Sequence, residues 1–180
     1  MSAPNGAVRL VPADLAAHRP ALLELSVEYV AWYEQVCEER YGLRLGDLLG
    51  VDARTYVEGS LDAMVTEAQL HGACYLLEVD GAAVGMGALR RSAEGVAEVK
   101  RMYVRPGHRG RRLGATLLAR LVEDARSLGY DHVRLETGEF MASAHRTYEA
   151  VGFVDREPFE DAENPKELLP HLRFMELSLR

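Results

Sequence analysis

The sequence predicts a single α/β domain with a mixed central sheet and helices on both faces. Its 180 residues, 48% hydrophobic and 27% charged, match the size and composition of one soluble globular domain. Strand-like and helix-like hydrophobic patterns alternate along the chain without an internal repeat or a long linker. Glycine and proline separate these patterns where turns and helix ends are expected. We therefore expect residues 1–6 to form a flexible N-terminus and residues 7–180 to form the domain.

The N-terminal third predicts a short strand and two helices. The strand covers residues 7–11. The first helix starts at Pro20 and stops before Gly42, because proline suits the first helical turn and glycine suits the position after the last. The second helix is expected over residues 52–70. Its inward-facing residues, given by three-and-four spacing, are expected to be Tyr56, Leu61, Met64 and Val65.

The middle of the chain predicts three strands. Asp80-Gly81 is a strong signal for a two-residue hairpin turn between the first two strands. The third strand covers residues 97–104 and ends before Pro106 and Gly107. Simple alternation predicts that one of its faces carries Glu98, Lys100, Met102 and Val104, and the other Val99, Arg101 and Tyr103.

The C-terminal half predicts two further helices, each followed by strand-like sequence. An amphipathic helix begins at Leu113 and is stopped by Gly129, with Leu128 among its inward-facing residues. A strand follows over residues 132–137, and the next helix ends at Gly152. One or two strands complete the sheet near the C-terminus.

Charge and composition exclude several classes of function. The formal net charge of −7 argues against a nucleic-acid partner and weakly favours a cationic acceptor. No apolar run reaches the ~18 residues that span a bilayer, so no membrane partner is expected. The first ten residues lack the plan of a signal peptide, which predicts a cytoplasmic location. Cys37 and Cys74 make no disulfide framework, and we expect two buried, inert thiols.

One turn, in the stretch VRPGHRGRRLGATLL (residues 104–118), concentrates four arginines and three glycines. It joins a strand to a helix, whose first amides have no intrahelical partner and whose dipole favours an anion there. Glycine lets a ligand approach the backbone, and arginine suits phosphate. The turn has no Gly-Lys-Ser/Thr sequence and no G-x-G-x-x-G spacing, which excludes two familiar phosphate loops. A diphosphate fits this charge and spacing and is the expected ligand. The alternative is a solvated basic turn that caps a core helix.

This stretch resembles the acyl-CoA signature of the GNAT superfamily of N-acetyltransferases, Gln/Arg-x-x-Gly-x-Gly/Ala. Arg109 matches its first position and Gly114 its last, whereas Arg112 replaces the middle glycine. If Arg112 is already helical, it fits without strain. Its side chain, or that of Arg105 or Arg111, is then expected to reach the 3′-phosphate of the cofactor.

Two more segments carry the resemblance. Residues 98–104 are similar to the family's central strand, and residues 144–153 to its A-x-x-L-Y-x-x-x-G-F segment. Thr147 replaces the leucine of that segment, and Met141 stands where many members carry an asparagine that contacts the cofactor. The order of the expected elements over residues 8–179 also matches the family. It implies a mostly antiparallel sheet of the acyl-CoA N-acyltransferase type.

The resemblance implies that acetyl-CoA is the acyl donor, and it implies where the donor binds. The pyrophosphate is expected on the amides of Arg109, Gly110, Arg111, Arg112, Leu113 and Gly114. The pantetheine is expected to pair with the backbone of Met102, Tyr103 and Val104. The sheet is expected to splay after this strand and so make room for the thioester. Homodimers are common in the family.

Acetyl transfer to an amine needs a proton acceptor for the amine and an acid near the departing thiolate. Tyr148 matches the family's tyrosine and is the candidate acid, unless it serves only as a core residue. Glu98 is the candidate base, unless its carboxylate is paired with a cation of the same strand. Weaker candidates for the base are Glu136 and Glu139, or a chain of water molecules.

The acceptor is expected near the first long helix, which overhangs the acceptor pocket in the family. Glu28, Tyr29, Trp32 and Tyr33 lie there, and aromatic side chains hold amines by cation–π contacts. The alternative is that they pack into the core.

The expected function is transfer of acetyl to a primary amine of a small molecule or protein, by direct attack in a ternary complex and without a metal. One alternative is a GNAT-type transferase that uses another acyl-CoA. The other is a non-catalytic acetyl-CoA-binding regulatory module.

Overall fold

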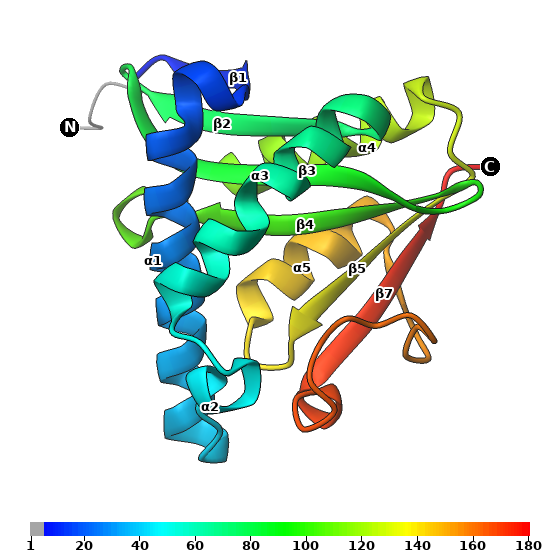
Figure 1. The fold of residues 1–180 in the computed structure, drawn as a ribbon. Coiled ribbons are helices and arrows are strands. Elements are labelled where there is room, and N and C mark those ends of the chain that lie inside the picture. The colour runs from blue at the N-terminus through cyan, green and yellow to red at the C-terminus, as the bar shows by residue number, and fades with distance from the viewer. Residues whose placement is uncertain (1–5) are drawn as a thin grey trace.

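The computed structural model describes residues 6–180 and shows a seven-stranded sheet with helices on both faces (Figure 1). The strand order is β1-β2-β3-β4-β5-β7-β6. β4 and β5 are parallel, and the other neighbouring strands are antiparallel. The predicted fold class is confirmed. The expected flexible N-terminus falls on residues 1–6, of which residues 1–5 lie outside the described residues.

The elements follow the predicted order. The strands are β1 (Val8–Pro12), β2 (Ala73–Val79), β3 (Ala82–Ala93), β4 (Val96–Val104), β5 (His132–Gly138), β6 (Val154–Arg156) and β7 (Leu172–Ser178). The helices are α1 (Leu15–Tyr41), α2 (Leu45–Leu49), α3 (Ala53–His71), α4 (Leu113–Ser127) and α5 (Ala142–Val151). The five-residue helix α2 was not expected. None of these helices of residues 6–180 is long and apolar enough to cross a membrane.

The first helix begins at Leu15 rather than at Pro20. The Asp14 carboxylate accepts a hydrogen bond from the Ala17 amide at 2.8 Å and so caps the helix N-terminus. Pro20 therefore lies in the second turn, where it lacks one helical hydrogen bond. The C-terminal boundary is as expected, because Gly42 adopts a left-handed φ of 67° there.

Two side chains that were expected inside lie on the surface. Tyr56 is 38% exposed and Leu128 is 52% exposed. The buried line of α3 includes Val57 and Leu61, and Tyr56 lies about 100° round the helix from Val57. Leu128 follows the last helical residue of α4 and no longer belongs to its apolar face.

The sheet separates two main hydrophobic clusters. Helices α1 and α3 cover one face (Figure 1), where Leu22 and Leu61 pack with Met86 of β3. Helices α4 and α5 cover the other face, where Leu117 and Leu121 are among the buried side chains. The two cysteines are free and buried, as predicted.

A bulge in β4 changes which side chains share a face. Arg101 has a left-handed φ of 50°, and the register with β3 shifts between Met86 and Ala88. Met102 consequently packs with the α4 side of the sheet, and Tyr103 packs with the α1 and α3 side. The predicted alternation is therefore wrong beyond Lys100, because one extra residue reverses the faces that follow it.

Strands β4 and β5 diverge after a short contact. Their pairing covers Val96–Glu98 and His132–Arg134 only. Beyond Glu98 the backbone of β4 has no partner on β5, and the two strands open into a V in Figure 1. The splay that the family resemblance implied is present.

Candidate active site

A cavity of about 510 Å³, called here the first cavity, lies where β4 ends. One wall is the last part of β4, residues 102–104. The opposite walls are the turn and first residues of α4 (108–110 and 112–115) and the start of α5 (140–144). Thr147 and Tyr148 of α5 also line it.

Two helix N-termini meet at the first cavity. Neither α4 nor α5 has a side-chain cap. The first intrahelical bond of α4 runs from the Thr116 amide to the Arg112 carbonyl at 3.0 Å. That of α5 runs from the His145 amide to the Met141 carbonyl, also at 3.0 Å. The amides between these residues have no intrahelical partner, and both helix dipoles place positive charge at the cavity. This arrangement suits a diphosphate.

The turn before α4 contains two left-handed residues. Gly110 has a φ of 77° and Arg112 a φ of 58°. Arg112 occupies the N-cap position, so the hypothesis that it is helical and unstrained is wrong. An L-residue with a side chain is disfavoured in this region by roughly 1 kcal/mol, whereas glycine is not. Arg112 thus holds a conformation that the family's glycine would hold without strain.

Tyr148 is buried, with 6% of its surface exposed, and lines the first cavity. Burial raises the pKa of its phenol above the ordinary value of 10.0. The phenol therefore keeps its proton at physiological pH and can donate it in a hydrogen bond.

A larger cavity of about 690 Å³, called here the second cavity, lies beneath α1, α2 and α3. Its walls include Tyr33 of α1, Tyr56 of α3, Arg101 of β4 and Glu136 of β5. Tyr29 lines both cavities, so the two adjoin at this residue. The sheet opening between β4 and β5 thus has one cavity associated with each side.

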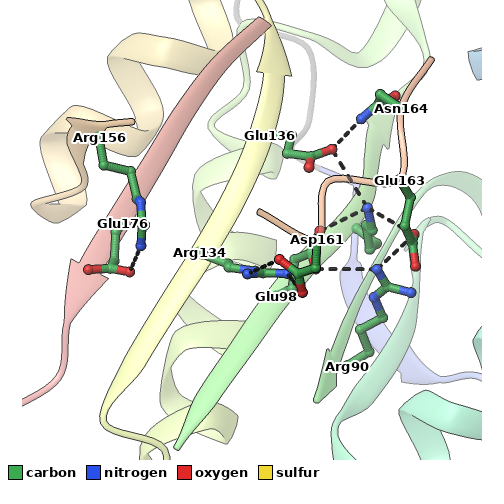
Figure 2. Close-up of polar contacts among 10 residues, drawn as sticks. Arg90, Glu98, Arg134, Glu136, Arg156, Asp161, Glu163, Asn164 and Glu176 are labelled. Carbon is green, nitrogen blue, oxygen red and sulfur yellow. Dashed lines mark hydrogen bonds and ion pairs between the residues drawn. The ribbon is translucent and has the colours of Figure 1, made fainter. Parts of the chain in front are cut away.

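Glu136 places a carboxyl group in the wall of the second cavity, with its side chain only 7% exposed. Asn164 donates a hydrogen bond to it, and the two residues point toward each other in Figure 2. Burial raises the pKa of Glu136 above its ordinary value, although Lys100 Nζ at 3.9 Å opposes this change. A carboxylate of raised pKa is better matched to proton transfer near neutral pH.

Comparison with known proteins identifies the family. The model of the Acetyltransferase (GNAT) family matches residues 30–153. The chain belongs to this family. An IAA acetyltransferase of Azospirillum brasilense is 44% identical over 80 residues, 44% of this chain and 52% of that protein. An uncharacterized N-acetyltransferase of Escherichia coli, YjgM, is 32% identical over 103 residues, 55% of this chain and 62% of that protein. The chain spans about half the length of the curated relatives it matches.

Solved structures share the fold along almost the whole GNAT chain. A putative acyl-CoA N-acyltransferase of Klebsiella pneumoniae is 28% identical, with a TM-score of 0.67 and coverage of 97% of this chain and 98% of that one. The structure of yncA, a putative acetyltransferase from Salmonella typhimurium with its cofactor acetyl-CoA, is 22% identical. Its TM-score is also 0.67, and the match covers 97% of this chain and 95% of that one.

Most predicted cofactor-binding residues of this GNAT protein line the first cavity: Met102, Tyr103, Val104, Arg109, Gly110, Arg112, Leu113, Gly114 and Tyr148. Arg111 is not among the lining residues. Arg105, a candidate for the 3′-phosphate, is instead held by Glu24 at 2.6 Å and Glu28 at 2.7 Å. Its guanidinium is thereby committed to α1.

Glu98, the candidate base, is 1% exposed and lines neither cavity. Figure 2 shows it within an ion cluster, with Arg90 and Arg134 each 3.3 Å away. Lys100 Nζ lies at 2.8 Å. Burial alone opposes ionisation, but these three cations hold the pKa of Glu98 below its ordinary value. The structure therefore favours the alternative that Glu98 is an ion-pair partner, because a surrounded carboxylate of lowered pKa is a poor proton acceptor.

The predicted acceptor residues divide between the cavities. Tyr29 lines both, Trp32 lines the first, and Tyr33 lines the second. Glu28 lines neither, because its carboxylate pairs with Arg105. These aromatic residues also pack on one another and on Phe140, whose ring lies 5.7 Å from that of Trp32. These aromatic side chains therefore both line the cavities and pack against one another.

The sequence analysis missed several cavity residues. At the start of α5, residues 140–144, the sequence indicated only Met141 as a cofactor position, but the whole segment faces the first cavity as the start of α4 does. The sequence could have indicated this segment, because it is a second connection from a strand to a helix that lacks a capping side chain. Apart from Glu136, the charged wall of the second cavity had no sequence signal, since β4, β5 and the 163–165 segment meet only in the fold. Within residues 6–180, no group of three or more histidine, cysteine or acidic side chains is arranged to hold a metal ion.

Proposed function

We propose that this GNAT protein transfers an acetyl group from acetyl-CoA to a primary amine by direct attack in a ternary complex. The observation that supports this most is the adjoining of the two cavities at Tyr29, beside the splayed part of β4. A donor in the first cavity and an acceptor in the second can then meet in the sheet opening.

The first cavity has the chemistry that the donor needs. The uncapped starts of α4 and α5 offer backbone amides and positive dipoles to the pyrophosphate. The β4 backbone at residues 102–104 has no β5 partner, so it is available to pair with the pantetheine amides. The amide of Met102 or Tyr103 is the proposed donor to the thioester carbonyl as negative charge develops there.

Proton transfer divides between the two cavities. Glu136, in place of Glu98, is the proposed acceptor of the first proton from the ammonium group. The free amine attacks the thioester carbon, a C–N bond forms and the C–S bond breaks. Tyr148 donates a hydrogen bond to the departing sulfur, and the second proton lost by the nitrogen neutralises the thiolate. The products are the acetamide and free CoA thiol, with one proton released to solvent.

Two findings on relatives support acetyl-CoA as the donor. The yncA structure carries acetyl-CoA, and PaiA N-acetyltransferase of Thermoplasma acidophilum was solved in complex with coenzyme A. The relative from Azospirillum is named an IAA acetyltransferase. The alternatives of a longer acyl group and of a non-catalytic regulatory module are separated by the experiment below.

The experiment measures thermal unfolding with acetyl-CoA and thiol release across a panel of amines. We expect acetyl-CoA to raise Tm and at least one amine to release CoA thiol. Gly110→Ala should weaken acetyl-CoA binding about tenfold, because it strains a left-handed residue in the anion site. Gly129→Ala, equally left-handed with a φ of 80° but at the far end of α4, is the matched control.

Each alternative has its own outcome. The absence of a Tm shift at millimolar acetyl-CoA would remove the proposed donor. A Tm shift with acetyl-CoA, together with no release of CoA thiol in the presence of any amine of the panel, would favour the regulatory module. Faster thiol release from succinyl-CoA or propionyl-CoA than from acetyl-CoA would change the acyl group.

A further inference from the structure

Arg101 lies in the wall of the second cavity at the bulge of β4. Its left-handed φ of 50° turns its side chain toward α3, where Nη2 donates a hydrogen bond to Ser60 Oγ at 2.6 Å. The guanidinium also lies 5.9 Å from the centroid of the Tyr56 ring. Strained backbone of this kind is concentrated at functional sites, because the surrounding fold must maintain it.

The charge of Arg101 is not balanced by the described part of the chain. No carboxylate of residues 6–180 lies within 4.0 Å of its guanidinium, although Glu67 lines the same cavity. Nη1 is buried and makes no hydrogen bond within those residues. Burial lowers the pKa of Arg101, because the protein around the guanidinium stabilises its charge less well than water does. A partly buried cation without a carboxylate partner is costly, so the site is suited to an incoming anion.

The other two cations of this wall are already paired. Arg90 contacts Glu98 at 3.3 Å and Glu163 at 2.9 Å. Lys100 contacts Glu98 at 2.8 Å. Arg101 therefore differs from its neighbours in having no carboxylate partner, and a carboxylate is the anion whose geometry matches a guanidinium.

The rest of the second cavity suits an amine with an apolar body. Glu136 supplies negative charge for an ammonium group and is the proposed proton acceptor, whereas the carboxylate of Glu163 is already paired with Arg90. Tyr29, Tyr33 and Tyr56 supply aromatic surface. The volume of about 690 Å³ is that of a small-molecule site.

We propose that the acceptor is a small amino carboxylate, of the amino-acid class, and that Arg101 binds its carboxylate in the second cavity. This inference rests on the proposed function, since it names the substrate class of the same site. It replaces the cationic acceptor that the net charge weakly favoured, because the local charge of the cavity wall, not the charge of the whole chain, contacts the substrate.

The test uses three matched pairs that differ only in the carboxylate: phenylalanine and phenethylamine, tyrosine and tyramine, and leucine and isoamylamine. Calorimetry in the presence of free CoA measures binding without turnover. We expect the wild-type protein to bind the acid member of at least one pair 10- to 100-fold more tightly. In Arg101→Asn this preference should fall below threefold, with the affinity for the amine member unchanged.

Asparagine tolerates the left-handed region, so this variant retains the backbone conformation. A second variant, Arg101→Gly, serves the same purpose. Both should unfold at a temperature equal to or above that of the wild type, because they remove a partly buried charge that has no carboxylate partner. Arg54→Asn, at an exposed arginine of α3 paired with Glu58, controls for the loss of one charge.

Three outcomes would overturn the proposal: no acid member binds below 10 mM, both members of every pair bind equally, or the preference survives in Arg101→Asn. Parallel assays of thiol release distinguish a failure of the carboxylate-binding proposal from a failure of the proposed transferase function. Arg101-dependent binding of carboxylates without thiol release would contradict the transferase and support the inference. Equal thiol release from acid and amine members would support the transferase and contradict the inference.

Discussion

Glu98 Oε1 lies 2.8 Å from Lys100 Nζ, and this contact is part of an ion cluster that surrounds the buried Glu98 with cations of β3, β4 and β5. The contact explains why a glutamate of the central strand, placed as the sequence suggested, is a poor base. Its negative charge is already balanced by Arg90, Lys100 and Arg134.

Glu98→Gln is expected to lower the free energy of unfolding by about 3 kcal/mol, because it leaves buried cations without their partner. The pH profile of kcat/KM should keep its shape and its midpoint. Urea unfolding and the pH–rate profile measure the two effects. Glu58→Gln, at an exposed position, should change stability by less than about 0.5 kcal/mol. An upward displacement of the profile in Glu98→Gln would restore Glu98 as the base.

Glu136→Gln is expected to lower kcat/KM about 100-fold, since it removes the proposed proton acceptor. The pKa of Glu136 is raised, so the carboxylate form and the activity it supports are lost as pH falls through a value above the ordinary 4.5. The acidic limb of the wild-type profile should therefore lie above that value and disappear in the variant. Glu139→Gln is the control, because Glu139 lines neither cavity. An unchanged rate in Glu136→Gln would favour a chain of water molecules.

Tyr148→Phe is expected to lower kcat about 100-fold and to change the affinity for acetyl-CoA less than twofold. The phenol acts on the departing sulfur, whereas backbone amides hold the pyrophosphate. Stopped-flow turnover and calorimetry separate the two quantities. Tyr41→Phe, outside both cavities, should leave both unchanged. Full activity in Tyr148→Phe would leave Tyr148 with a core-packing role alone.

Arg112→Gly is expected to raise the free energy of unfolding by about 0.5 kcal/mol, because the relief of left-handed strain exceeds the added chain entropy. Arg111→Gly should have the opposite sign, since Arg111 is not among the residues with positive φ. If the Arg112 side chain contacts the 3′-phosphate, Arg112→Gly should weaken CoA binding more than 3′-dephospho-CoA binding. Equal losses for both ligands would place the Arg112 side chain in solvent.

The sequence predicted a turn or a helix correctly where the residues of that element carry its pattern. The Asp80-Gly81 turn lies between β2 and β3 with both residues at positive φ, as the dipeptide indicates. Helix α4 begins at Leu113, where its apolar face begins. The bulge at Arg101 had no such signal, because an arginine does not mark a left-handed residue as glycine does. The faces of Met102 and Tyr103 were therefore assigned incorrectly.

The sequence by itself determined the fold class, the turn rich in arginine and glycine before α4, and the first-cavity residues of β4 and of that turn, together with Tyr148. The fold class and the turn depend on periodicity, glycine and helix ends, which act over a few neighbouring residues, whereas the resemblance to the GNAT family implied the roles of the β4 residues and Tyr148. Only the tertiary structure decided which charges meet. It showed that Glu98 is enclosed by Lys100, Arg90 and Arg134, and that Arg101 has no carboxylate partner within residues 6–180. Electrostatic pairing depends on distances between strands that are remote in the chain, and no local pattern records those distances.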